Sequence, residues 1–102
     1  MSIKKRYLKG KPVCKVTFGL SKEEAKSART VNIVGEFNNW NTLATTMKRL
    51  KDGSFTVTID LEVGKEYQFR YLIDRMHWEN DGDADRHIAS PFRDSQNSVV
   101  IV

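Results

Sequence analysis

Few side chains in this 102-residue sequence could carry out covalent chemistry. Cys14 with His77 or His87 could form a thiol and base pair, but Cys14 alternates with polar residues in the pattern of a buried strand position. Carboxylate pairs that hydrolyse glycosidic bonds act from two sides of a deep cleft, and a core of this size leaves no room for one. We therefore expect no catalytic site.

The acidic segment at Asp81, Asp83 and Asp85 has the spacing found at the start of a calcium-binding loop. Such a loop needs glycine at its sixth position and glutamate at its twelfth, where this chain has Arg86 and Phe92. The sequence also has no cysteine and histidine cluster with metal-ligand spacing and no phosphate-binding glycine loop. We interpret the acidic segment as a solvated loop and expect no metal and no cofactor.

The two tryptophans have the clearest binding chemistry. Trp40 lies among Asn38, Asn39 and Asn41. An amphipathic ring beside three amides is poorly explained by packing alone. This segment is therefore a candidate binding loop.

The face on which Trp78 lies depends on the hairpin that precedes it. A three-residue loop pairs Asp74 with Trp78, and the indole then shares an outward face with Arg70 and Gln68. A two-residue loop instead pairs Trp78 with Ile73 and turns the ring inward. No glycine in the turn decides between these registers, and we favour the outward position.

An exposed indole near amide and guanidinium groups suits a sugar ligand. A pyranose ring offers an apolar C–H face for stacking and a rim of hydroxyls for hydrogen bonds. Single-stranded nucleic acid also stacks on aromatic rings and is the rival ligand. Because the segment around Trp78 is acidic and would repel phosphates, we expect no nucleic-acid partner.

The elements that must position these side chains are strands. Apolar and polar residues alternate with the period of two that half-buried strands require. This alternation occurs in residues 13–20, 30–37, 55–61 and 67–73. A return strand with Trp78 and a last strand at 98–102 follow, while residues 21–29, 80–85 and 90–92 are expected to be loops. Many short strands without a long helical pattern predict an all-β sandwich or small barrel.

The composition is that of a small globular domain, with 39% hydrophobic and 29% charged residues. The longest apolar run, residues 99–102, is too short to span a bilayer, so we expect no membrane partner. The single cysteine excludes an internal disulfide. Because the sequence also shows no secretory signal, we expect a cytoplasmic protein.

Charge is distributed unevenly along the chain, whose net charge is +4. Residues 1–30 carry nine Lys or Arg and two Glu, whereas residues 61–102 carry five Lys or Arg and eight Asp or Glu. We interpret residues 1–12 as a basic N-terminal leader and residues 13–102 as one binding module. Charge asymmetry at a terminus is more often solvated surface than a polyanion site.

The segment VNIVGEFNNWN at residues 31–41 resembles the glycogen-binding domain of AMP-activated protein kinase beta subunits. Such domains are family 48 carbohydrate-binding modules, related to the N-terminal (early set) domains of isoamylases and glycogen branching enzymes. Further motifs follow in the family's order and spacing, namely DGSF at 52–55, GKEYQFRYLID at 64–74, WEND at 78–81 and NSVV at 97–100. The resemblance implies an immunoglobulin-like β-sandwich of about seven to eight short antiparallel strands that binds α-1,4-linked glucan and has no catalytic activity.

The resemblance also implies roles for individual residues. Trp40 and Trp78 match the family's two stacking tryptophans. Arg70 matches a basic residue that reaches sugar hydroxyls, Asn97 matches a hydrogen-bonding asparagine on the last strand, and Ser95 falls where a hydroxyl often assists.

The sequence departs from the kinase domains at two places. Residues 75–77 replace a glycine turn and lengthen it by one residue, although Asp74 and Trp78 can still pair. Arg93 stands where an apolar residue clasps the ligand in the kinase domains. That contact is not expected here.

The leading hypothesis is a stand-alone, non-catalytic module that binds glycogen, starch or maltooligosaccharide by tryptophan stacking. The alternative is an interaction or regulatory module that docks on a glucan-metabolising enzyme or kinase through a sheet edge or the basic leader, without binding sugar itself. A glycogen-metabolising enzyme is thus the second class of partner. A third hypothesis, nucleic-acid binding by a small basic β-domain, predicts affinity that falls steeply with salt.

Overall fold

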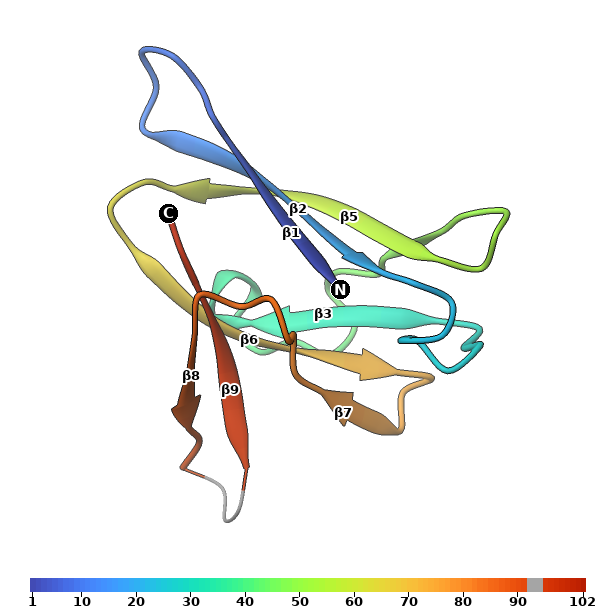
Figure 1. Ribbon diagram of the computed structural model, residues 1–102. Coiled ribbons are helices and arrows are strands. Elements are labelled where there is room, and N and C mark those ends of the chain that lie inside the picture. Colours follow the sequence, from blue (N-terminus) through green and yellow to red (C-terminus); the bar gives the residue numbers. More distant parts are fainter. Residues whose placement is uncertain (92–94) are drawn as a thin grey trace.

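The computed structural model describes residues 1–91 and 95–102. These residues form nine strands and one short 3₁₀ turn, arranged as two packed antiparallel sheets (Figure 1). The elements are β1 (Ser2–Tyr7), β2 (Val13–Leu20), β3 (Val31–Gly35), η1 (Glu36–Asn38), β4 (Lys48–Arg49), β5 (Phe55–Glu62), β6 (Glu66–Ile73), β7 (His77–Glu79), β8 (Arg86–Ala89) and β9 (Gln96–Ile101). The fold is an immunoglobulin-like β-sandwich, as expected, rather than a barrel.

The first sheet has the strand order β1-β2-β5-β4. Its centre is the ladder between β2 and β5, which pairs Val13 with Glu62 at one end and Leu20 with Phe55 at the other. The alternation predicted for β2 is confirmed, because every second residue from Cys14 onward is buried. Cys14 is therefore a core residue of this sheet.

The second sheet has the order β3-β6-β9-β8, and β7 pairs with the end of β6. Phe69, Tyr71 and Ile73 of β6 face the first sheet and belong to the common core. Phe18 of β2 meets Phe69 across the sandwich with ring centroids 5.1 Å apart in an edge-on contact. One hydrophobic core thus joins the two layers seen in Figure 1.

Three strands lie where the sequence predicted none, and the shortest of them, β4, is a two-residue pairing with β5. Ser2–Tyr7, inside the segment interpreted as a leader, forms the edge strand β1 and pairs along its whole length with β2. Arg86–Ala89 forms β8, which is exposed throughout and pairs with β9. Both are edge strands rich in charged or exposed residues. A backbone ladder holds them without requiring a buried face in the sequence.

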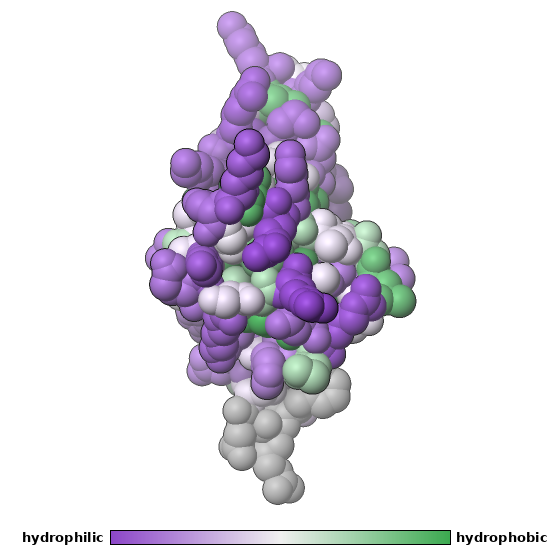
Figure 2. Space-filling model, turned by 90° about the vertical axis from the view of Figure 1, so that its right-hand side faces the viewer, coloured by the Kyte–Doolittle hydropathy of each residue, from purple (hydrophilic) through white to green (hydrophobic). Residues whose placement is uncertain are grey.

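The segments expected to be loops carry turns or bends in residues 21–29 and 80–85. Within the part of the chain that the structure describes, no helix has the length and hydrophobicity needed to cross a membrane. The side of the molecule on which the turn between β6 and β7 lies is covered mainly by hydrophilic side chains, with small separate hydrophobic areas (Figures 1 and 2).

Candidate functional site

Trp40 lies just after η1, in a loop that its neighbouring asparagines hold together. The Asn38 side-chain oxygen accepts a hydrogen bond from the Gly35 N–H at 3.0 Å. The Asn41 side-chain oxygen likewise accepts from the Leu43 N–H at 2.9 Å. These two amides therefore build the loop, which explains part of the asparagine cluster structurally. The indole itself remains 40% exposed.

The Trp40 loop is set closely against β6. The backbone N–H of Trp40 donates to the Gly35 carbonyl at 2.8 Å, and Gly35 pairs with Phe69 in the ladder between β3 and β6. A Cβ at Gly35 would lie 2.5 Å from the Gln68 carbonyl oxygen. The Glu36 carboxylate also accepts the Gln68 backbone N–H at 2.6 Å. Glycine is required here by the close approach of two backbones.

Trp78 is outward and 46% exposed, on the face that the three-residue loop predicted. The predicted partner is wrong, however, because Trp78 pairs with Leu72 and not with Asp74. Ile73 pairs with His77, so the loop comprises Asp74, Arg75 and Met76. Because the register is shifted by two residues, the side chains stay on the predicted face.

Asp74 fastens this hairpin to the start of β3. Its carboxylate accepts the backbone N–H groups of Thr30 at 3.1 Å and Arg29 at 2.8 Å. These backbone hydrogen bonds, that of Thr30 first, lower the pKa of Asp74. Asp74 and Arg75 have φ of 50° and 59°, so two residues other than glycine form the left-handed turn of this hairpin.

The segment after Trp78 is tied to β9. The Asn80 side chain donates to the Gln96 carbonyl at 2.9 Å, and its oxygen accepts from the Ser98 hydroxyl at 2.9 Å. Glu79 forms an ion pair with Lys26 at 2.7 Å. The strand that presents Trp78 is thus held on both sides.

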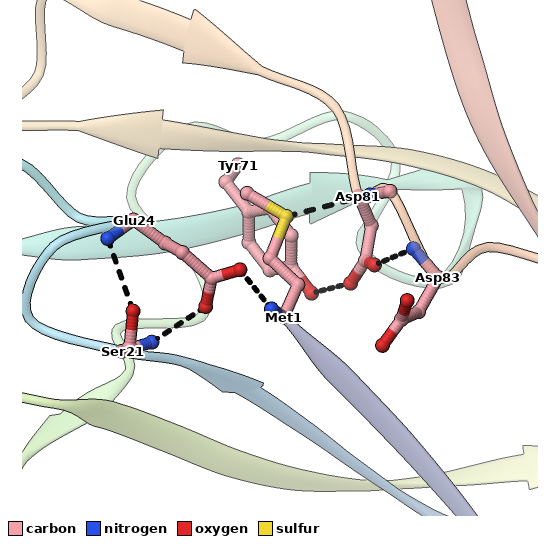
Figure 3. A network of polar contacts seen from close by, with 7 residues as sticks. Met1, Ser21, Glu24, Tyr71, Asp81 and Asp83 are labelled. Atoms are coloured by element: carbon pink, nitrogen blue, oxygen red, sulfur yellow. Dashed lines mark hydrogen bonds and ion pairs between the residues drawn. The ribbon is translucent and has the colours of Figure 1, made fainter.

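A buried polar cluster lies beneath this segment (Figure 3). The Tyr71 hydroxyl donates to the Asp81 carboxylate at 2.5 Å, and the Asp83 backbone N–H donates to its other oxygen at 2.8 Å. Burial raises the pKa of Asp81, and burial together with the nearby carboxylate raises the pKa of Tyr71. Figure 3 also shows Glu24 paired with the Met1 amino group beside this cluster.

Carboxylates of the acidic segment accept hydrogen bonds from other groups of the protein. Asp85 accepts hydrogen bonds from the Lys5 ammonium group and the Ile101 N–H, each at 2.7 Å. Asp81 accepts from Tyr71 and from backbone, as described above. These carboxylates hold the chain between β7 and β9 in place. The interpretation as a solvated loop is therefore wrong for Asp81, which is buried.

Arg70 and Asn97 meet on the outward face of the second sheet. The Arg70 Nε donates to the Asn97 side-chain oxygen at 2.6 Å. The Asn97 amide nitrogen in turn donates to the side-chain oxygen of Gln68 at 2.9 Å. Asn97 is only 5% exposed, whereas Gln68 and Arg70 are half-buried. A chain of three polar side chains therefore crosses from β9 to β6.

Ser95 lies just before β9 and is half-buried. Its carbonyl oxygen accepts the Ser90 N–H at 3.0 Å, which places the two residues on either side of the chain reversal before β9. Arg93, the second departure from the kinase domains, lies outside the described residues.

Strand register brings most of these residues to one face. Arg70, Leu72 and Trp78 share the outward side of β6 and β7, and Asn97 joins them from β9. The Trp40 loop begins at Gly35, which pairs with Phe69, the residue before Arg70 on β6. No ring contact joins the two indoles among the residues described. They are separate exposed rings, Trp78 on the outward side of β7 and Trp40 in the loop after η1.

A family model described as carbohydrate-binding module 48 (isoamylase N-terminal domain) matches residues 21–92. The chain belongs to this family. The match includes Trp40, Arg70 and Trp78, whereas Asn97 and Ser95 lie beyond it. No curated protein matches the sequence significantly. Membership in carbohydrate-binding module family 48 associates the chain with carbohydrate binding in general.

Gln68 is the polar residue of this face that the sequence did not single out as a site residue. Gln68 lies two residues before Arg70 on β6 and therefore on the same outward face, which is the sequence signal that could have identified it. The contact with Asn97 was not visible, because it depends on the register between β6 and β9.

Proposed function

We propose that this module binds α-1,4-linked glucan, such as glycogen, starch or maltooligosaccharide, without catalysing a reaction. The observation that carries the proposal is the exposure of Trp40 and Trp78 in a member of a carbohydrate-binding family. Phe18, Phe69 and Tyr71 are all fully buried, so the two indoles stand apart from the aromatic core. Exposed indoles are suited to stack on the apolar face of a pyranose ring.

The polar chain on the same outward face as Trp78 supports the same proposal. Arg70 is half-buried, and its guanidinium group has five N–H donors, of which the Nε donor contacts Asn97. The remaining donors suit sugar hydroxyl oxygens. Because an open face buries little ligand surface, affinity for a short oligosaccharide is expected on the order of 10 to 1000 μM.

Titration with maltoheptaose, followed by tryptophan fluorescence and amide chemical shifts, tests the proposal together with retention on glycogen. Trp40→Ala and Trp78→Ala should each weaken retention about fivefold or more while remaining folded, taking stacking on one ring to contribute roughly 1 to 3 kcal/mol, as it does for nucleic-acid bases. Tyr7→Ala is the matched control, since Tyr7 is a still more exposed aromatic residue on the edge strand β1 of the other sheet.

A wild-type protein that neither shifts with maltoheptaose nor binds glycogen would refute the proposal. Loss of folding in either tryptophan variant would assign its ring to the core instead. Equal loss in the Tyr7→Ala variant would show that retention does not depend on the proposed face.

A second candidate function is docking on a glucan-metabolising enzyme or kinase. The outer edge of β1 favours it, because among the described residues this strand pairs with β2 alone and its Lys4 and Arg6 are exposed. Co-purification of one such enzyme, with no retention on glucan, would support docking over sugar binding.

A further inference from the structure

Asn97 is poorly placed to contact a ligand directly. It is buried, its side-chain oxygen accepts the Arg70 Nε at 2.6 Å, and its amide nitrogen donates to Gln68 at 2.9 Å. Both ends of its amide group are therefore engaged by neighbouring side chains. A sugar would have to displace one of these hydrogen bonds to reach it.

Gln68 is more accessible to solvent than Asn97, and the oxygen and nitrogen of its side-chain amide have different surroundings. Its side-chain oxygen accepts from Asn97, so the amide nitrogen with its two N–H groups points away from that contact. No described residue accepts a hydrogen bond from this nitrogen. The Gln68 backbone is fixed by the Glu36 carboxylate, which accepts its N–H at 2.6 Å. Gln68 thus offers donors from an anchored position.

We propose that Gln68 contacts the glucan and that Asn97 is a positioning residue, which acts through Gln68 and Arg70. The inference rests on the proposed function and adds a binding residue to it. Because Asn97 takes the acceptor of Gln68 and the Nε of Arg70, these two side chains present N–H donors to the ligand. The ligand hydroxyls that meet this face therefore act as acceptors.

The first test replaces Gln68 by Met, which has similar length and no N–H donor. Loss of a hydrogen bond in a half-buried site should weaken maltoheptaose binding about tenfold, measured by calorimetry. Gln96→Met is the matched control. Gln96 is exposed and one residue before Asn97 on β9, so its side chain is in the opposite phase of the strand.

The second test combines Asn97→Asp with the Gln68 variant. Aspartate still accepts from Arg70, but its second oxygen accepts where Asn97 donates, so the Gln68 amide must turn and bring its oxygen toward the ligand. Asn97→Asp alone should therefore weaken binding about five- to tenfold. In the Gln68→Met background, the same change should alter affinity by less than about twofold.

The outcomes separate this inference from the proposed function. Wild-type affinity in Gln68→Met would overturn the inference while leaving glucan binding established. An equal loss from Asn97→Asp in both backgrounds would assign a direct sugar contact to Asn97 and also overturn it. Failure of the wild-type protein to bind glucan would refute the proposed function and the inference together.

Discussion

The outward faces of the two sheets differ in how much of them is covered. On the first sheet, Lys15 and Thr58 are accessible, and the strand positions alternate between buried and open. On the second sheet, Val34, Leu72 and Val99 are also turned away from the core by register, yet none is more than 6% exposed. The second sheet therefore has packed apolar residues on both sides.

The two faces also differ in how their polar groups are used. Thr17 and Thr58 share a hydrogen bond of 2.8 Å on the first sheet, and Lys15 pairs with Asp60 at 2.9 Å. On the second sheet, the Asn97 side chain bonds to Arg70 and Gln68, and these two neighbours keep N–H donors that Asn97 does not use. A covered face with a few free N–H donors and the exposed Trp78 indole suits a ligand better than a face whose polar residues bond to one another.

The largest expected effect comes from breaking the approach of the Trp40 loop to β6. Gly35→Ala places a Cβ 2.5 Å from the Gln68 carbonyl oxygen and 2.7 Å from the Phe69 Cβ. Overpacking of backbone against backbone should lower the free energy of unfolding by about 3 kcal/mol, measured by urea denaturation. Gly82→Ala is the control, because a Cβ there meets open space. Equal stability of the two variants would contradict the close approach.

A smaller, pH-dependent effect is expected from Tyr71→Phe, which removes the hydroxyl donor from the buried Asp81. Burial raises the pKa of Asp81, and the Tyr71 hydroxyl opposes that rise, so the variant should have a still higher pKa. A raised pKa in the folded state means that stability falls as pH rises through it.

The cost of Tyr71→Phe should therefore be about 2 kcal/mol at neutral pH and smaller near pH 4, where a larger share of Asp81 is protonated because burial raises its pKa. Urea denaturation of both proteins at the two pH values measures the difference. A cost that does not change with pH would show that the ionised carboxylate does not depend on the hydroxyl.

The first sheet should tolerate loss of its own polar contacts. Thr17→Val removes the hydrogen bond to Thr58 and keeps a β-branched side chain, so the free energy of unfolding should fall by at most about 1 kcal/mol. Affinity for maltoheptaose should be unchanged within error. A weakened affinity would place ligand binding on the first sheet and remove the functional contrast between the faces.

The smallest effect is expected from salt. Stacking on a neutral sugar releases few counterions, so raising NaCl from about 50 to about 500 mM should change glucan affinity by less than about twofold. The same titration with single-stranded oligonucleotide tests the rival ligand. Affinity for the oligonucleotide that exceeds that for glucan and falls steeply with salt would favour the nucleic-acid hypothesis.

The sequence was most informative where one sheet face is buried and the other is open. The alternation in residues 13–20 and 55–61 predicted β2 and β5 almost to their ends. β8 has no such alternation, because all four of its residues are exposed. β1 was not predicted, because the charged residues Lys4, Lys5 and Arg6 favoured a solvated leader over an edge strand.

Site residues were predictable to the extent that strand phase determines them. The outward position of Trp78 followed from the odd number of residues in the hairpin loop, even though its partner is Leu72 and not Asp74. The burial of Asn97 could not be read in the same way. It results from contacts between side chains on β6 and β9, which lie far apart in the sequence.

The ladder between β2 and β5 also bears on how the chain acquires its structure. Val13 pairs with Glu62, so the hairpin of β1 and β2 is synthesised well before its neighbouring strand. A two-stranded hairpin by itself is marginally stable in water. Phe18 of β2 packs against Phe69 of β6 in the opposite sheet, so the inward side of β2 remains accessible to solvent until β6 has also been synthesised. Folding should be a late, cooperative event on the scale of milliseconds to seconds, as for other sandwiches with distant strand pairings.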